Sequence, residues 1–183
     1  MRERILVTAT GRFVARGYEG VAMREIAEAC GITKAALYYH FAGKSDVLNA
    51  IFTGYLDEIA EVVEASADHG SGEQRLRWLV QHLFALPAGR RAIMRLAMHD
   101  VGQLEPEQRA SFGTAYIDRF IGPLQQIVAD GVASGEFVAK DPSLVVWILL
   151  GMLYPFFAPR GGPGVDADSI DDLLDVFFGG LSA

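Results

Sequence analysis

Apolar residues recur along most of the chain at spacings of three and four, and this pattern predicts amphipathic helices. In the first segment Ile5, Ala9 and Phe13 form one apolar stripe, and Gly17 follows as a residue that ends a helix. A short second helix is predicted over residues 23–30. No segment combines sustained apolar–polar alternation with Asn-Gly or Asp-Gly turns, so hairpins are not expected. The sequence therefore predicts an all-α fold.

The next two predicted helices each follow a residue suited to capping a helix. Thr33 is the expected N-cap of a helix over residues 34–41, and Ser45 that of a longer helix ending near residue 67. Two short helices joined by a turn that contains Gly31 form a helix-turn-helix pattern. The second helix of such a unit lies in the DNA major groove and contacts base edges through its N-terminal residues. The helix over 34–41 is therefore the first candidate for DNA binding.

The remainder of the chain is also predicted to be helical. Five further helices are predicted over residues 73–86, 88–101, 106–135, 142–158 and 166–180. Pro123 lies inside the longest of them and should kink or divide it. The run 144–158 carries no charge, but it is shorter than the roughly 20 residues that span a membrane, and Pro155 interrupts it. We expect a buried or interfacial helix there and no membrane segment.

The charge of the chain is unevenly distributed. The net charge is −7, yet residues 1–48 hold seven Lys and Arg against five Asp and Glu, whereas residues 49–183 hold nine against eighteen. A mildly basic head suits nucleic acid or an anionic membrane, and an acidic body suits neither. The hydrophobic fraction of 51% and the charged fraction of 21% are those of a folded globular protein.

Residue types that often carry chemistry are scarce in this chain or badly spaced for it. Cys30 is the single cysteine, which excludes an internal disulfide and, with no long apolar leader, favours a cytoplasmic setting. No pair among His69, His82 and His99 has close metal-ligand spacing. The glycine-rich loop 161–164 lacks the Lys-Ser/Thr of a phosphate loop, and there is no Gly-x-Ser-x-Gly nucleophile motif. We therefore expect no enzymatic activity, no metal and no cofactor.

A set of motifs near the N-terminus is specific to one family of DNA-binding proteins. The motifs are Ile5-Leu6, Ala9, Phe13, Gly17-Tyr18, Arg24-Glu25-Ile26-Ala27, Ala29-Cys30-Gly31-Ile32-Thr33-Lys34, Leu37-Tyr38-Tyr39-His40-Phe41 and Lys44. Through them, residues 5–48 resemble the N-terminal DNA-binding domain of the TetR family of transcriptional repressors. The resemblance implies an all-α dimer with a three-helix, helix-turn-helix DNA-binding domain over residues 1–48. Residues 49–183 would form a helical ligand-binding and dimerisation domain.

The resemblance also implies roles for residues around the third helix. The implied phosphate contacts are Thr33, Tyr38, Tyr39, His40 and Lys44. Lys34, Ala35 and Ala36 would face base edges, with Arg24 close to the DNA backbone. Ala22 stands where the family usually has Thr or Ser, so it cannot cap the second helix, at a cost of about 1 kcal/mol. Because the two alanines offer thymine methyl groups only apolar contact, specificity is expected to depend on Lys34 and on DNA shape.

The body of the chain is rich in aromatic residues and methionines, which form adaptable apolar linings. A small hydrophobic ligand is expected to bind among Trp78, His82, Met94, Met98, Phe112, Tyr116 and Trp147. An ordinary core has a similar composition, so each of these residues also has a purely structural interpretation. By the resemblance, a homodimer forms through residues 142–158 and 166–180, whose apolar face includes Phe177.

Together these patterns lead to a functional hypothesis. We expect a cytoplasmic, homodimeric repressor that binds a pseudo-palindromic operator in double-stranded DNA and is released by a small hydrophobic ligand. Its two recognition helices would lie roughly 34–36 Å apart, one turn of DNA. Two alternatives keep the same fold: a regulator controlled by a protein partner, or an activator. A third hypothesis is an enzyme or a membrane-associated protein that uses the apolar body.

Overall fold

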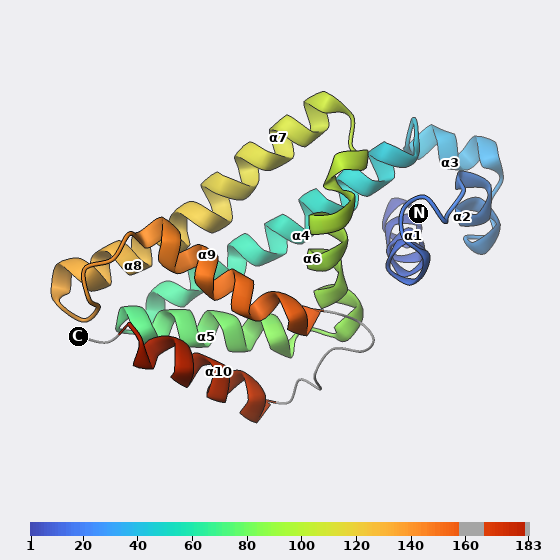
Figure 1. The fold of residues 1–183 in the computed structure, drawn as a ribbon. Coiled ribbons are helices and arrows are strands. Elements are labelled where there is room, and N and C mark those ends of the chain that lie inside the picture. Colours follow the sequence, from blue (N-terminus) through green and yellow to red (C-terminus); the bar gives the residue numbers. More distant parts are fainter. Residues whose placement is uncertain (158–166, 182–183) are drawn as a thin grey trace. The chain divides into compact units, whose positions relative to one another are not determined.

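The fold follows the helical pattern of the sequence (Figure 1). The structure, a computed structural model, describes residues 1–157 and 167–181. The first four helices are α1 (Arg2–Arg16), α2 (Met23–Ala29), α3 (Lys34–His40) and α4 (Lys44–Ala65). The later helices are α5 (Gly72–Ala85), α6 (Ala88–Asp100), α7 (Pro106–Tyr116), α8 (Gly122–Ser134), α9 (Pro142–Leu153) and α10 (Ala167–Gly179). The all-α prediction is confirmed.

The chain divides into two compact units, each built from two segments. The head unit comprises Met1–Tyr55 and Ala92–Thr114, and the body unit comprises Leu56–Arg91 and Ala115–Ala183. Helices α4, α6 and α7 contribute residues to both units. Helix α4 runs without a break through residues 48 and 49, where the sequence predicted a domain boundary, and that boundary stays a prediction.

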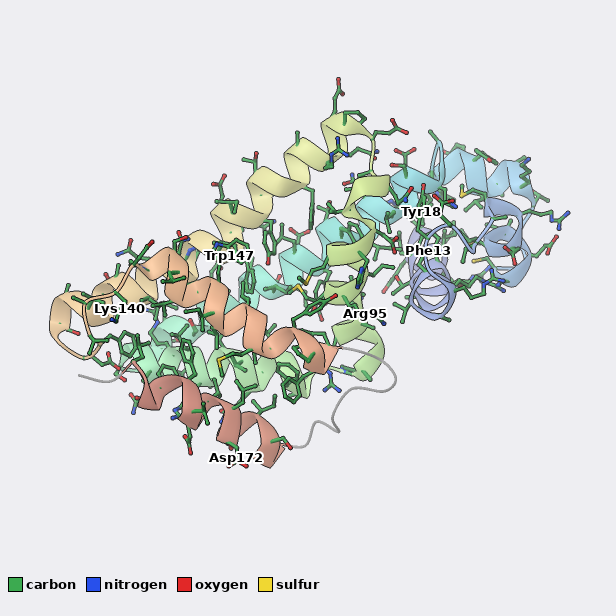
Figure 2. All side chains as sticks on the ribbon, viewed as in Figure 1. Phe13, Tyr18, Arg95, Lys140, Trp147 and Asp172 are labelled. Atoms are coloured by element: carbon green, nitrogen blue, oxygen red, sulfur yellow. The ribbon has the colours of Figure 1, made fainter. Side chains whose placement is uncertain are left out.

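A small apolar core holds α1, α2 and α3 together. Its fully buried side chains include Ile5, Phe13, Ile26 and Leu37. Gly17 and Gly31 end α1 and α2 as predicted, with φ angles of 74° and 62° in the region that favours glycine. The ring of Phe13 lies 5.6 Å from that of Tyr18, so the chain after α1 is packed onto the same core (Figure 2).

Helix α4 begins at Lys44, and the prediction that Ser45 caps it is wrong. Ser45 is the second helical residue, and its Oγ donates a hydrogen bond to Oε1 of Gln108 at 2.6 Å. The amide of Gly43, just before the helix, is satisfied by Oδ2 of Asp46 at 2.9 Å. A carboxylate three residues into the helix thus binds the amide at the helix start, and no serine cap is needed.

The predicted helix over residues 106–135 is divided, as the position of Pro123 led us to expect. A π-helix, Ile117–Ile121, separates α7 from α8, and Pro123 is the second residue of α8. Proline has no amide to donate to the carbonyl four residues earlier, which here belongs to Arg119. The turn before it is wide, with the amide of Gly122 bonded to the carbonyl of Ile117.

In the body unit, α5 packs against α8 and α10, and α8 packs against α9. An ion pair of 2.8 Å between Arg77 and Asp175 ties α5 to α10. Phe177 is only 8% exposed, and its ring lies 5.0 Å from that of Phe178. Phe177 was expected on a dimer-forming surface, but it is buried within its own chain, on a helix that packs against α5.

Helix α9 is apolar on both of its sides. The buried side is formed by Val145, Val146, Leu149 and Leu153. Leu144, Trp147 and Ile148 are each about half exposed, and Figure 2 shows Trp147 on this helix. Among the described residues, no helix is long and apolar enough to cross a membrane. The predicted helix limits at 158 and 166, and the loop 161–164, lie outside the described residues.

Candidate nucleic-acid interface

Two local features shape the turn between α2 and α3. Gly31, with its positive φ of 62°, lets the chain change direction after α2. Oγ1 of Thr33 accepts a hydrogen bond from the amide of Ala36 at 3.1 Å, which is the predicted N-cap interaction. Leu37 is fully buried, so α3 is anchored to the core by one face and its opposite face is left to solvent. Helix α3 is thus an exposed helix with a fixed start.

The open face of α3 carries side chains that were expected to meet DNA. Tyr39 is 86% exposed, and Lys34 and Tyr38 are also exposed. Nζ of Lys34 lies 5.6 Å from the centre of the Tyr38 ring, and the His40 ring lies 5.3 Å from that of Tyr39, edge to face. Phenol and ammonium groups held in this way are suited to donate hydrogen bonds to phosphate oxygens.

The start of α2 has no side-chain cap, as Ala22 predicts. Oε2 of Glu25 accepts from the amide of Ala22 at 2.8 Å, and Oε1 of Glu25 accepts from Arg16 at 2.8 Å. The bond from the Ala22 amide and, to a smaller extent, the bond from Arg16 hold the pKa of Glu25 below its usual value. Half of a capping box therefore remains. Its contribution to stability is present above the usual carboxyl pKa and is lost as the pH falls through the lowered value.

Lys44 makes two contacts within the head unit. Its Nζ donates to the carbonyl of Tyr18 at 3.0 Å and lies 4.0 Å from the centre of the Tyr18 ring. Burial, with smaller contributions from Glu19 and Glu105, raises the pKa of the Tyr18 phenol. An ammonium group has three donors, so the bond to Tyr18 leaves two for a phosphate. Lys44 is therefore a positioned cation, held at the first residue of α4.

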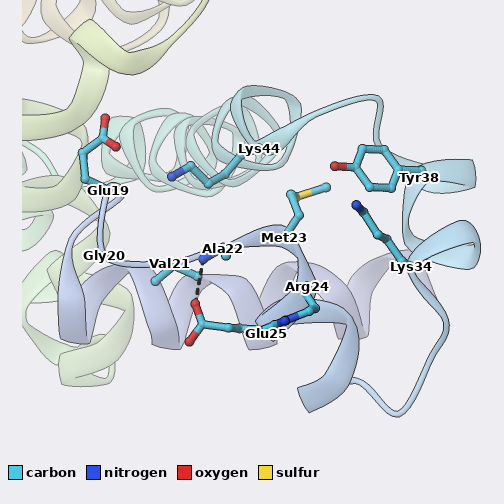
Figure 3. A pocket seen from close by; sticks show the side chains of 10 residues that line it. All are labelled: Glu19, Gly20, Val21, Ala22, Met23, Arg24, Glu25, Lys34, Tyr38 and Lys44. Carbon is cyan, nitrogen blue, oxygen red and sulfur yellow. Dashed lines mark hydrogen bonds between the residues drawn. The ribbon is translucent and has the colours of Figure 1, made fainter.

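A pocket of about 610 Å³ lies among the start of α2, the open face of α3 and the start of α4. It is lined by Glu19, Gly20, Val21, Ala22, Met23, Arg24, Glu25, Lys34, Tyr38 and Lys44. In the view of Figure 3, Lys44 and the Lys34–Tyr38 pair lie on either side of Met23. The pocket thus combines three cationic side chains and one phenol with two carboxylates. The cationic side chains and the phenol can donate hydrogen bonds to phosphate oxygens, whereas the two carboxylates oppose a phosphate placed beside them.

The nine residues predicted to bind DNA all lie in the head unit. They are Arg24, Thr33, Lys34, Ala35, Ala36, Tyr38, Tyr39, His40 and Lys44. Four of them line the pocket, and Ala35 is exposed on α3 beside it. Ala36 is only half exposed, and Arg24 forms an ion pair of 3.3 Å with Glu28 on the surface of α2. The contact that each would make with DNA stays a prediction.

Two residues with a part in this site were not assigned from the sequence. Met23 lines the pocket between the two lysines, and Tyr18 holds Lys44 through its ring and its carbonyl. Tyr18 was noticed as part of a family motif, but it lies 26 positions before Lys44. Sequence spacing gives no signal of a contact over such a separation, because it depends on where the turn after α1 lies relative to the first residue of α4.

Trp78 and His82, both predicted to bind ligand, are in direct contact in the body unit. The Trp78 ring is stacked between His82, at 3.9 Å, and His69, at 4.2 Å. Both faces of the indole are therefore covered by imidazole rings. An aromatic ligand can stack on Trp78 only after one of the two histidines has moved.

The other predicted ligand-binding residues differ in their burial. In the head unit, Met94 is buried, Met98 is 56% exposed, and the Phe112 ring lies 5.5 Å from that of Phe52. In the body unit, burial raises the pKa of Tyr116 to about 12, whereas Trp147 is 49% exposed. The set is thus shared between the two units, and its role in ligand binding stays a prediction.

The geometry of the head unit agrees with comparisons to known proteins. Residues 5–51 match the family of bacterial regulatory proteins called the tetR family, and residues 69–157 match the tetracyclin repressor-like C-terminal domain. A TetR/AcrR-family transcriptional regulator from Thermobifida fusca, of known structure, is 30% identical, with 98% of this chain and 97% of that chain covered and a TM-score of 0.72. The chain belongs to the TetR family of transcriptional regulators.

Two further relatives of this TetR-family protein have a named ligand or a named regulatory role. AibR, whose structure contains isovaleryl coenzyme A and operator DNA, is 29% identical with a TM-score of 0.83, and 96% of each chain is covered. The transcriptional activator FasR of Mycolicibacterium smegmatis is 34% identical over 84 residues, which are 45% of this chain but 38% of FasR. The TetR-family protein described here is a helix-turn-helix, DNA-binding transcriptional regulator.

Proposed function

We propose that this protein is a cytoplasmic, homodimeric repressor that binds a pseudo-palindromic operator and leaves it when a small hydrophobic ligand binds. One observation carries the DNA-binding and ligand-binding parts of the proposal: the chain resembles AibR over nearly its whole length, and the AibR structure holds isovaleryl coenzyme A and operator DNA together. Release of the operator by the ligand does not follow from that structure and is the step that the DNA titration tests. Repression is proposed over activation because the transcriptional repressor KstR2 of Rhodococcus jostii is 26% identical over 138 residues, which are 71% of this chain and 66% of KstR2.

On this proposal, the open face of α3 enters the major groove. Lys34 and Ala35 meet base edges there, and the exposed Tyr39 reaches a phosphate. Lys44 supplies a cation whose position is supported by its contact with Tyr18. The small Ala35 and the half-exposed Ala36 leave much of the sequence discrimination to Lys34 and to DNA shape.

The exposed stripe of α9 supports the homodimer. Leu144, Trp147 and Ile148 follow the i, i+3, i+4 spacing of one helix face, and all three are about half exposed in the single chain. A contiguous apolar stripe of this kind is typical of an interface between subunits. A two-fold axis near α9 would pair the stripe with itself and present two copies of α3 to one DNA face.

The effector is proposed to present an apolar group, whatever polar group is attached to it, to the aromatic and methionine side chains predicted from the sequence. Acyl thioesters of coenzyme A with short branched or straight chains are the first class to test, because AibR binds isovaleryl coenzyme A. Trp78 and Trp147 are the two tryptophans of the chain, so ligand binding is expected to quench tryptophan fluorescence.

The test begins with a DNA duplex selected from a random pool by the wild-type protein. Isovaleryl coenzyme A and longer acyl thioesters are then titrated against free protein, by fluorescence, and against the protein–DNA complex, by anisotropy of labelled DNA. By linkage, the factor by which an effector weakens DNA binding equals the factor by which DNA weakens binding of the effector. Such factors are typically about 5- to 150-fold. Free coenzyme A serves as the control for the thioester chain.

The alternatives give different results in the same experiment. A compound that quenches the tryptophans and leaves DNA affinity unchanged is not the effector. If every compound behaves so, control by a protein partner is the better hypothesis. FasR is an activator, and an activator would keep its DNA affinity or gain affinity when the ligand binds. Turnover of the thioester would favour an enzyme, and binding to anionic vesicles would favour a membrane-associated protein.

A further inference from the structure

Helices α4 and α7 begin in the same way. Oδ2 of Asp46 accepts from the amide of Gly43, the residue before α4, at 2.9 Å. Oε1 of Gln108 accepts from the amide of Glu105, the residue before α7, at 3.3 Å. In each case the third helical residue binds the amide at the helix start, which is one half of a capping box.

These two helix starts are joined to each other by side chains. Nε2 of Gln108 donates to Oδ1 of Asp46 at 2.6 Å, and Oγ of Ser45 donates to Oε1 of Gln108 at 2.6 Å. Oγ of Ser45 also accepts from the amide of Glu105 at 3.1 Å. We call Ser45, Asp46 and Gln108 the helix-start clamp. All three side chains are half-buried, and all belong to the head unit.

The clamp holds the part of the chain that leads out of the recognition helix. Helix α3 ends at His40 and α4 begins at Lys44, so three residues separate the DNA-facing helix from the clamped turn. Gly43, the last of the three, is bonded by the clamp, and Lys44 is the next residue. Without these bonds the first turn of α4 would fray, and only the contact with Tyr18 would hold Lys44.

We propose that Gln108 is a positioning residue for DNA binding, which acts through Ser45 and Asp46 and makes no contact with DNA. Gln108 lies outside the helix-turn-helix segment, 62 positions after Asp46. Its amide group supplies the donor for Asp46 and the acceptor for Ser45, and neither a carboxylate nor an apolar group supplies both. The start of α7 thereby determines how firmly the start of α4 is held.

An exchange of donor and acceptor tests this role. Gln108→Glu places two carboxylates against each other and should weaken binding to the selected duplex about tenfold, within the range of coupling measured for contacting residues. In Gln108→Glu combined with Asp46→Asn, the new Asn amide donates to the new Glu, and its oxygen still accepts from Gly43. The double variant should recover to within about threefold of Asp46→Asn alone.

Two further measurements separate positioning from direct contact and from simple loss of stability. The slope of affinity against salt concentration should stay unchanged in Gln108→Glu, because no phosphate contact is removed. Hydrogen exchange at the amides of Gly43 and Glu105, followed without DNA, should become about tenfold faster in Gln108→Glu and return to normal in the double variant. Gln103→Glu adds the same charge at an exposed residue and is the matched control.

The proposal is overturned if Gln108→Glu binds DNA as Gln103→Glu does. It is equally overturned if the double variant, with normal hydrogen exchange, still binds as weakly as Gln108→Glu. If Gln108→Glu does not fold, Gln108→Leu replaces it in the affinity and exchange measurements. Normal DNA affinity of that variant, with fast exchange at Gly43, would show that the clamp is structural only.

Discussion

The residues predicted to bind DNA and those predicted to bind ligand are brought together by the chain in different ways. The DNA set lies between Arg24 and Lys44, and four of its members line one pocket. The ligand set extends from Trp78 to Trp147 over four helices and is shared between the two compact units. A contiguous set owes its geometry to helix periodicity and caps, whereas a dispersed set depends on long-range packing.

The same contrast holds for individual side chains. In the DNA set, Tyr39, which is 86% exposed, lies on the face of α3 opposite the buried Leu37, as helix geometry requires. In the ligand set, Trp78 is covered on both faces by imidazole rings, and Met98 is more exposed than buried. The surface predicted to bind DNA is thus already formed, while a ligand site at Trp78 requires a side chain to move.

The largest effect is expected from the apolar stripe of α9, through which we propose that the dimer forms. Ile148→Asp adds a charge to an exposed position, so each chain should still fold. The dimer should dissociate, and affinity for the selected duplex should fall about a hundredfold or more, because the two heads no longer bind as one unit. Sedimentation and DNA anisotropy measure the two outcomes.

Ala85→Asp, at an exposed residue of α5, controls for the added charge. If Ile148→Asp remains dimeric at micromolar concentration, the α9 stripe is not the interface. Phe177→Asp is a poor substitute, since Phe177 is buried within its own chain and the charge would unfold the body unit.

The second effect concerns Tyr116, the most strongly shifted phenol described in the body unit. Burial raises its pKa to about 12, so this phenol stays neutral in the folded protein while it ionises in the unfolded chain above pH 10. Stability is therefore unaffected below pH 10 and falls between pH 10 and about 12, by on the order of 2 kcal/mol. Urea unfolding at pH 9 to 11.5 measures the decline.

In Tyr116→Phe this decline should be smaller than in the wild type. Tyr39→Phe, at an exposed tyrosine, should leave the decline as it is in the wild type. An identical decline in Tyr116→Phe would mean that Tyr116 is solvated in solution, and a packed body around it would be contradicted.

The third effect concerns the positioned cation of the head unit. Lys44→Ala should weaken DNA binding about tenfold and reduce the salt slope by about 1, because one fewer counterion is released. The loss should be nearly uniform across DNA sequences. Lys44→Arg keeps the charge and should retain the salt slope. An unchanged slope in Lys44→Ala would leave Lys44 with its contact to Tyr18 as its sole role.

The smallest effect is expected for Tyr39, an exposed residue of the DNA set. Tyr39→Phe removes one hydroxyl and should weaken DNA binding about fivefold, which corresponds to the free energy of about 1 kcal/mol that one hydrogen bond contributes. The salt slope should not change, because no charge is lost. Equal affinity of Tyr39→Phe and wild type would remove this hydroxyl from the phosphate contacts. Thermal melting should be the same for both proteins in either case.

Much of the head unit was predictable because its signals are local. Gly17 and Gly31 end helices, Thr33 caps α3, and Ala22 leaves α2 without a side-chain cap, as the sequence predicted. Ser45 was assigned the wrong role, because a hydroxyl near a helix start resembles a cap whatever it binds. Its partner, Gln108, lies 63 positions away in the chain.

The sequence by itself determined the helices, the breaks between them, the exposed face of α3 and the family, since each depends on residues within a few turns of one another. Tertiary structure alone decided where Lys44 is held, which residues form the helix-start clamp and which face of α9 remains open. It also placed Phe177 inside the core and Trp78 between two histidines. These contacts join residues far apart in the chain, and they exist only because packing of the apolar faces brings their helices together.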